Sequence, residues 1–518
     1  MERDHALSGR ETNGLARVPR RGFLSAALVG LLRKTDRIVS GSFVNESDEL
    51  GHRLRSRGPF RTPAQRERVP VVVVGAGMAG LSAAWRLEKR GFRDFVLLEM
   101  EKQAGGVSRW GENEITAFPW GAHYVPVPGP HSLLIRELLA DLGVLMDGKW
   151  DERHLCFSPQ ERLFLHGRWQ EGIEPELAAT ARDREQYRRF EERMREFRAS
   201  GAFTIPMERA GRSPDAALDH VPMGEWLRRE GFDSPYLNWY VNYACRDDYG
   251  AAAAATSAWA GVHYFASREP DDKGPLTWPE GNGWIARRLA SRFKPHIRTG
   301  SVVFRIVRES ARVRVFTEDV EFVADCVIFA APTFLAPYVM EDAPPVGGFE
   351  YSPWLTANLV VDRPPQDQNS EVAWDNVIYD SPALGYVVAT HQSLGTVEGP
   401  TVWTFYWALA EGPAPRNRRL LLTTDWAYWK EAILNDLSRA HADIRQRVAR
   451  IDIMRMGHAM VRPQVGFLSS AERLRAAAAN GPVLFAHSDL SGFSIIEEAQ
   501  YRGVTAADRA LARLGGRR

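Results

Sequence analysis

The sequence has few cysteines, almost no net charge and no long hydrophobic run, and each shortage excludes a class of protein. Cys156, Cys245 and Cys326 are its only cysteines, and their wide spacing forms neither a disulfide framework nor a zinc-binding pattern. Lys and Arg exceed Asp and Glu by one residue (66 against 65), which argues against a nucleic-acid-binding protein. No His-Glu-x-x-His motif indicates a metal site, and no Gly-x-Ser-x-Gly motif indicates a hydrolase.

The N-terminal region has a composition of its own. Arg20 and Arg21 precede a short, mildly apolar segment, Phe23–Leu32, and this order resembles a twin-arginine export signal. The segment is too short to span a bilayer, and no other segment is long and apolar enough to do so. We therefore expect residues 1–67 to form a signal-like arm, with a linker over 51–70, and the protein to be exported to the periplasm by the twin-arginine machinery.

Two features favour the alternative, a basic arm with a chance arginine pair in a cytoplasmic protein. Arg33 and Lys34 follow the apolar segment directly, and no Ala-x-Ala cleavage site is present.

A glycine-rich turn between an apolar strand and a helix is the strongest signal in the chain. Four valines at 71–74 predict a buried parallel strand, and Gly75–Gly80 follows with the spacing G-x-G-x-x-G. A helix over 81–89 would offer free N–H groups to phosphate. A second apolar strand, 95–98, ends at Glu99, a residue type that accepts hydrogen bonds from a ribose diol. A glycine turn that merely packs a helix on a sheet would leave Glu99 unexplained.

Several later segments have clear periodicity. Charged residues with apolar ones at helical spacing predict an amphipathic helix over 180–200. Strands are expected in 301–332, β-like aromatic segments with one helical stretch (425–449) in 346–455, and a short strand at 481–486. A helix beginning near Ile496 closes the chain.

Together with the glycine turn, short segments scattered from about residue 69 to 515 resemble the flavin-containing amine oxidase superfamily, which includes phytoene desaturases and protoporphyrinogen oxidases. The chain looks still closer to uncharacterised bacterial FAD-dependent oxidoreductases with twin-arginine signals, through segments 243–250, 257–268 and 457–460. The superfamily-like segments are Gly105-Gly106 with Ser108-Arg109, 120–123, 278–283, 303–306, 324–332 and 485–489.

The resemblance implies a fold, a cofactor and an activity. The fold would be α/β, with a Rossmann-like FAD-binding domain of the amine-oxidase type (68–130, 280–345 and 455–515) and an interleaved α+β substrate domain (131–279 and 346–454). The protein would be an FAD-dependent oxidoreductase that transfers a hydride from a C–N or C–H centre of a small organic substrate to flavin. Three alternatives stay open: a desaturase of a lipid-like substrate at a membrane, a non-catalytic FAD-fold protein, and a nicotinamide dehydrogenase.

The resemblance also implies cofactor-binding residues. Main-chain N–H groups at 76–79 would hold the pyrophosphate, Glu99 the ribose, and Arg109 with the glycine doublet the phosphates and flavin edge. The Val303 main chain would bind adenine, Asp489 would accept from the ribityl chain, and the helix starting near Ile496 would point its N-terminus at the flavin. The full set is Gly75, Ala76, Gly77, Met78, Ala79, Gly80, Glu99, Gly105, Gly106, Ser108, Arg109, Gly121, Ala122, His123, Val303, Ala331, Ser488, Asp489 and Ile496.

Four residues are candidates for a catalytic role. Many amine oxidases have a lysine that reaches the flavin through a water, and here Asn358 is the nearest match. This departure argues against amine oxidation with rapid reoxidation by oxygen, and it leaves C–H dehydrogenation, desaturation and a different electron acceptor open. Asp247 and Asp248 are candidates for a general base or a cation-binding pair, against a solvated turn or a structural ion pair. His458 is a candidate base, although a structural role is favoured for it.

The substrate-side half is also rich in aromatic residues. They favour packing in a sheet over a cage for a cation or a cover for an apolar substrate. Cys245, beside Arg246, is expected to be a small core residue rather than a reactive thiol.

Overall fold

The computed structural model describes residues 37–44, 48–210, 216–268, 274–365, 370–393 and 399–515. The arginine pair and apolar segment that resemble an export signal lie outside the described residues, so export stays a prediction. Within the described ranges, no helix combines the length and the apolar character that crossing a bilayer requires.

The glycine-rich turn follows the central strand of a five-stranded, all-parallel sheet with the order β12-β3-β2-β16-β22. The central strands are buried along their whole length, which explains why each is an unbroken apolar run. The sheet joins segments that lie hundreds of residues apart: β2 (Val71–Val74), β3 (Phe95–Leu98), β12 (Ile297–Arg298), β16 (Cys326–Phe329) and β22 (Val483–Phe485).

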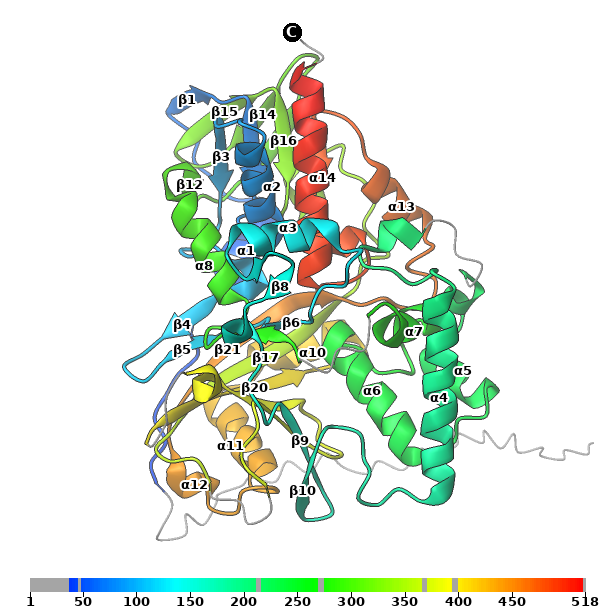
Figure 1. The fold of residues 1–518 in the computed structure, drawn as a ribbon. Helices are drawn as coiled ribbons and strands as arrows, with labels where there is room; N and C mark the ends of the chain where they lie inside the picture. The colour runs from blue at the N-terminus through cyan, green and yellow to red at the C-terminus, as the bar shows by residue number, and fades with distance from the viewer. Residues whose placement is uncertain are drawn as a thin grey trace, which may run out of the picture. The chain divides into compact units, whose positions relative to one another are not determined.

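Two helices lie side by side against this sheet, α2 (Met78–Lys89) and α14 (Ile496–Gly515), in dark blue and red in Figure 1. Gly503 allows their close contact, because a Cβ there would lie 2.1 Å from the Ala79 carbonyl oxygen. Gly80 has no room for a side chain either, since a Cβ added there would lie 1.9 Å from the Gly75 carbonyl oxygen. Helices α3 (Leu133–Asp141) and α8 (Gly283–Arg292) also belong to this region.

A second sheet has four strands in the order β1-β15-β14-β13. Its strands are β1 (Gln65–Arg68), β13 (Arg305–Arg308), β14 (Val313–Phe316) and β15 (Val320–Ala324).

The linker expected over 51–70 contains two regular elements. These are most of α1 (Asp48–Arg55), tied down by the ion pair between Arg53 and Glu318 (2.6 Å), and the edge strand β1. The sequence of β1, Gln-Arg-Glu-Arg, has no apolar alternation because the strand buries no face, so its pattern could not reveal it.

The substrate-side half is built on a seven-stranded mixed sheet with the order β10-β9-β18-β19-β20-β17-β21. Its long strands β17 and β20 are buried on both faces, because helices cover the sheet (Figure 1). The strands are β9 (Glu161–Leu165), β10 (Arg168–Glu171), β17 (Tyr351–Val361), β18 (Asp375–Ile378), β19 (Gly385–Val388), β20 (Thr401–Ala408) and β21 (Val448–Val461).

The amphipathic helix predicted over 180–200 is confirmed as α4 (Ala181–Ala199), which begins with a capping box between Thr180 and Asp183. The single helical stretch expected over 425–449 is instead two helices, α11 and α12, followed by the start of β21. The other described α-helices are α5 (Met223–Arg229), α6 (Pro235–Tyr249), α7 (Ala258–Ala266), α9 (Ala336–Val339), α10 (Ala414–Thr423), α11 (Trp426–Leu437), α12 (Ile444–Arg447) and α13 (Ala471–Ala478).

Three two-stranded sheets are the remaining strand pairs among the described residues, and one of them, β6 with β11, bears on the site. They are β4 (Trp110–Glu112) with β5 (Ala117–Pro119), β6 (Tyr124–Val125) with β11 (Leu276–Thr277), and β7 (Leu145–Met146) with β8 (Lys149–Trp150).

The α2–α14 contact gives a stability prediction. We expect Gly503→Ala to destabilise the fold by about 1–3 kcal/mol, because the added methyl group meets backbone rather than a flexible side chain. The midpoint of thermal unfolding measures this effect. Gly51→Ala is the matched control, since it also lies in a helix but has open space around it. Equal midpoints for the two variants would contradict close packing at Gly503.

Candidate functional site

Two cavities adjoin at the carboxyl ends of the parallel strands. The large cavity, beside the glycine turn, has a volume of about 1290 Å³ with its open mouth included, and the small cavity, toward the seven-stranded sheet, has a volume of about 720 Å³ on the same measure. The two cavities are adjacent and share six lining residues, Val107, Ala122, Ala459, Ser494, Ile495 and Ile496.

Two glycine-bearing loops form the floor of the large cavity. The Gly105 N–H donates to the Ala76 carbonyl oxygen (2.9 Å), and a Cβ at Gly106 would lie 3.2 Å from the Cα of Gly77. Helix α2 starts directly after Gly77, with no side-chain cap and no acidic residue in its first turn. Its first N–H groups and its positive dipole end therefore favour an anion such as a phosphate.

Glu99 lies in the wall of the same cavity, at the end of β3. Its carboxylate accepts hydrogen bonds from the N–H groups of Ala76 (2.8 Å) and Glu101 (2.9 Å). Burial raises the pKa of Glu99, and the two N–H groups partly offset that rise. The Ala76 N–H is thus occupied by Glu99, so it does not fit the expected role of holding a pyrophosphate.

Most of the predicted cofactor residues line one of the two cavities. Gly121, Ala122, His123 and Ile496 line the small one. The large cavity is lined by Gly75, Gly77, Met78, Ala79, Glu99, Gly105, Gly106, Ser108, Ala122, Val303, Ala331, Ser488 and Ile496.

Arg109 does not line either cavity. Its guanidinium donates to the Gly106 carbonyl oxygen (3.1 Å) and lies 3.7 Å from the carboxylate of Glu101. This geometry supports the glycine loop from behind and does not match the expected contact with phosphate. Gly80 and Ala76 also lie outside the cavity walls.

Asp489 is fully buried and has structural partners. It accepts hydrogen bonds from the N–H (2.8 Å) and hydroxyl (2.6 Å) of Thr333 and from the Tyr351 hydroxyl (2.6 Å), and it lies 3.1 Å from His487 Nδ1. Burial alone would raise its pKa, but His487 and the hydrogen bonds outweigh burial and lower it. Asp489 lines neither cavity, and its hydrogen bonds join β16, β17 and β22, so the ribityl contact stays a prediction.

The catalytic candidates Asn358 and His458 lie away from both cavities. The amide of Asn358 donates to the Pro119 carbonyl oxygen (3.1 Å) and accepts from the Thr404 hydroxyl (2.6 Å). The ring of His458 stacks on Phe334 at 4.5 Å. Their present contacts are structural.

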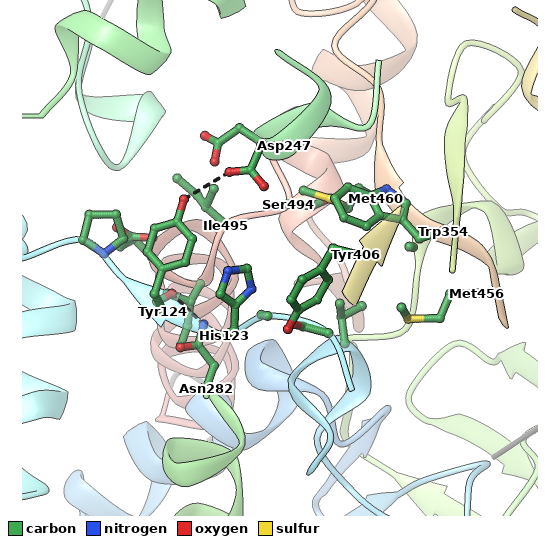
Figure 2. Close-up of a pocket in the computed structure, with 18 of the residues that line it drawn as sticks. His123, Tyr124, Asp247, Asn282, Trp354, Tyr406, Met456, Met460, Ser494 and Ile495 are labelled. Atoms are coloured by element: carbon green, nitrogen blue, oxygen red, sulfur yellow. Dashed lines mark hydrogen bonds between the residues drawn. The ribbon is translucent and has the colours of Figure 1, made fainter. Parts of the chain in front are cut away.

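Asp247 and Asp248, in the last turn of α6, do line the small cavity (Figure 2). Burial raises the pKa of Asp247 to about 7, with a further rise from Asp248, and burial raises the pKa of Asp248 to about 6 although Arg268 lowers it. Arg246 does not pair with them, because its guanidinium donates to the carbonyl groups of 381–383. The burial that raises both pKa values does not fit a solvated turn, whereas a structural ion pair stays open for Asp248, whose pKa Arg268 lowers.

The rest of the small cavity divides into a polar and an apolar side. Figure 2 shows the Tyr124 hydroxyl directed at Asp247, to which it donates at 3.4 Å. Trp354, Met456 and Met460 lie on the opposite side of the view. The cavity thus suits a molecule with one polar end and one apolar end.

His123 lies between these two sides. Its ring stacks on Tyr406 at 4.4 Å, and burial lowers its pKa to about 4, so it is neutral near pH 7. A neutral, weakly basic ring stacked on its neighbour suits positioning better than proton abstraction. Other aromatic residues of the seven-stranded sheet pack in the core, as predicted. The rings of Tyr386 and Trp403, for example, stack at 4.1 Å and are almost fully buried.

Several lining residues escaped sequence reasoning. Tyr124, Asn282, Arg268 and Glu497 occur in or beside the family-like segments, but nothing in their spacing placed them together. Leu54 reaches the large cavity from α1, in the region expected as a linker. Cys245 is a buried core residue as expected, and burial raises its pKa to about 12.

Comparisons with known proteins agree with this architecture. Residues 73–142 match the family described as NAD(P)-binding Rossmann-like domain. Putrescine oxidase, solved bound to putrescine, is 17% identical with a TM-score of 0.67 and aligns over 86% of this chain and 100% of its own. Cyclohexylamine oxidase from Brevibacterium oxydans is 16% identical with a TM-score of 0.65, over 86% and 99%. The predicted fold class is confirmed.

A sequence relative gives a more local match. Hydroxyneurosporene desaturase from Cereibacter sphaeroides is 32% identical over 256 residues, which is 40% of this chain and 49% of the desaturase. The chain therefore spans about half the length of this curated relative.

The bond network of Asp489 gives a second prediction. We expect Asp489→Asn to lower stability by about 1–3 kcal/mol, because an amide N–H₂ cannot accept from the buried donors. Because the folded pKa is lowered, the carboxylate's contribution is complete above the unfolded value of about 3.9 and is lost as pH falls through the folded value. The difference in thermal midpoint between variant and parent should shrink between pH 6 and pH 3. A constant difference, or an equal effect of the exposed-site control Asp94→Asn, would contradict this role.

Proposed function

Because the chain has the fold of the flavin-containing amine oxidases, we propose that it is an FAD-dependent oxidoreductase acting on a small organic substrate. The observation that carries the proposal is that two cavities adjoin: the cavity at the glycine turn and the cavity toward the seven-stranded sheet share six lining residues. A cofactor in the large cavity would thus lie beside a substrate in the small one.

The residues present fit FAD. The uncapped start of α2 supplies donors for a pyrophosphate, and the glycines at 77, 105 and 106 leave no side chain between the two loops. Glu99 keeps acceptor capacity for a ribose diol while it binds two N–H groups, since a carboxylate has about four lone-pair sites. Val303, Ala331 and Ser488 line the remaining length of the cavity.

Bound FAD would supply the acceptor for a hydride from a C–N or C–H centre of the substrate. The residues of the shared wall would hold the substrate against the cofactor, and this positioning is the main contribution we assign to the chain. Trp354, Met456 and Ile495 would exclude water from the reacting carbon. The neutral ring of His123, fixed by Tyr406, would shape the approach without carrying charge.

A second candidate is desaturation of a lipid-like substrate. The apolar side of the small cavity and the local likeness to a desaturase favour it. The two candidates differ in the substrate that would reduce the cofactor. In the first it would be an amine, and in the second an apolar molecule that is converted to an alkene.

The absorbance spectrum of the purified protein tests the proposal directly. We expect the visible bands of bound FAD and their anaerobic bleaching by one of a panel of amines, polyamines and alkenes. A colourless protein that does not take up added FAD would contradict the proposal. Retained flavin that no donor reduces would favour a non-catalytic protein.

Glu99→Ala tests the cofactor site. We expect about a 10–100-fold weaker affinity for FAD, because charge-assisted hydrogen bonds contribute about 1.5–3 kcal/mol each. The measurement is FAD titration of the flavin-free protein, with its thermal midpoint checked in parallel. Asp94→Ala, at an exposed position outside both cavities, is the control. Normal FAD affinity in Glu99→Ala would reject the ribose contact.

A further inference from the structure

One residue of the large cavity wall comes from the chain before the glycine turn. Among the described residues, Leu54 in α1 is the only one that lines this cavity and precedes β2. Its side chain is 5% exposed and belongs to the same hydrophobic cluster as Val303 and Val339, which line the cavity too. Leu54 thus lies where it would contact a molecule that fills the cavity.

Helix α1 depends on the rest of the fold for its structure. It has only eight residues, and isolated helices shorter than about 12–15 residues are marginal in water. It packs on α9, whose Val339 is part of the cavity wall. Leu54 is the one residue of α1 that this packing buries. The helix is therefore attached to the cavity wall through very few contacts.

An ion pair fixes the end of α1 from which Leu54 projects. The guanidinium of Arg53 donates two hydrogen bonds, at 2.6 and 3.0 Å, to the carboxylate of Glu318 in the turn between β14 and β15. It also donates to the Pro59 carbonyl oxygen (2.6 Å) and lies 4.5 Å from the centre of the Phe60 ring. Because a two-pronged arginine–carboxylate pair fixes the orientation of both partners, it also fixes where Leu54 lies.

The chain after α1 follows the same wall. The ring of Phe60 stacks on Phe304 at 4.6 Å, and Phe304 is the neighbour of the lining residue Val303. Strand pairing holds the chain on both sides, since β1 pairs with β15 downstream and residues 40–44 pair with β21 upstream. Residues 48–61 can therefore lift from the cavity while the chain on either side stays in place.

We propose that residues 48–61 are a strap that closes the cofactor cavity, with Leu54 as its contact to the cofactor, and that the strap detaches whenever the cofactor enters or leaves. The inference rests on the proposed function and adds a binding residue and a kinetic step to it. Opening breaks the pair of Arg53 and Glu318 and exposes Leu54, and α1 then loses the contacts that keep it helical.

The rates of FAD binding and release test the strap. Glu318→Gln weakens the anchor and leaves the cavity wall intact, because Glu318 lines neither cavity. We expect both FAD association and FAD release to become about tenfold faster, since each opening has to break this charge-assisted pair, while the dissociation constant stays nearly unchanged. Stopped-flow fluorescence with flavin-free protein measures association, and capture of released FAD by an excess of a second flavin-free flavoprotein measures release.

A second variant tests the contact. We expect Leu54→Ala to release FAD at least about tenfold faster and to bind it more weakly, because it removes part of the cavity wall. Glu185→Gln is the matched control for the anchor variant, since it breaks an exposed pair with Arg188 on α4, outside both cavities, and should match the parent. Parental FAD rates in both Glu318→Gln and Leu54→Ala would overturn the proposal.

Hydrogen exchange of the parent protein reports on the strap without any variant. The N–H groups of residues 56–58 donate to the carbonyl oxygens of 52–54 at 2.9–3.1 Å, so they are protected only while the end of α1 is formed. Bound FAD should slow their exchange at least about tenfold, because a ligand that contacts the closed strap stabilises it. The N–H groups of β1 should change less. Equal exchange of the strap with and without FAD would overturn the proposal, even if a variant fails to fold.

ADP, the adenosine diphosphate half that FAD shares with nicotinamide dinucleotides, separates this inference from the proposed function. Reducible flavin that binds and leaves at the same rates in the parent and in both strap variants would overturn the strap alone. A protein that refuses FAD but binds ADP, and binds it faster in Glu318→Gln, would overturn the oxidoreductase and leave the strap. Binding of neither ligand would overturn both.

Discussion

The close contact of two glycine-bearing loops is the constraint on which the candidate site depends. Because Gly77 and Gly106 lack side chains, the loop after β2 and the loop after β3 approach within the width of a backbone. This contact leaves the start of α2 uncapped and open to the large cavity. Any larger residue at these positions would fill the space in which an anion has to lie.

The contact also fixes what lies around it. Glu99 completes the loop by accepting the Ala76 N–H, and Arg109 supports it through the Gly106 carbonyl oxygen. On the far side of α2, Gly503 lets α14 pack at backbone distance, so the first turn of α14 reaches the wall between the two cavities. Close packing of helices and loops at glycine residues therefore brings the two cavities side by side, with six lining residues in common.

Local chemistry explains what the sequence could predict. The valines of β2, the glycine turn and Glu99 follow one another within 30 residues, and each has a conformational reason that needs no tertiary contact. The periodicity of α4 is equally local. The edge strand β1 was missed because its polar sequence has no period. The contacts of Arg109 and Asp489 with Glu101, Thr333 and Tyr351 could not be predicted because packing sets them. The group of charged residues at the small cavity likewise could not be predicted, because it forms only where α6, α7 and α14 meet in the fold.

The N-terminal segment has a consequence for the seven-stranded sheet. Strand β21 is an outer strand, and residues 40–44 cover its free side through hydrogen bonds from the Ser40 N–H to the Ala449 carbonyl oxygen (3.1 Å) and from the Ile453 N–H to the Ser42 carbonyl oxygen (2.9 Å). An uncovered outer strand is a template for pairing with another chain. Proteolytic removal of residues 40–44 would thus leave this edge of β21 unpaired and open to pairing with a strand of another chain.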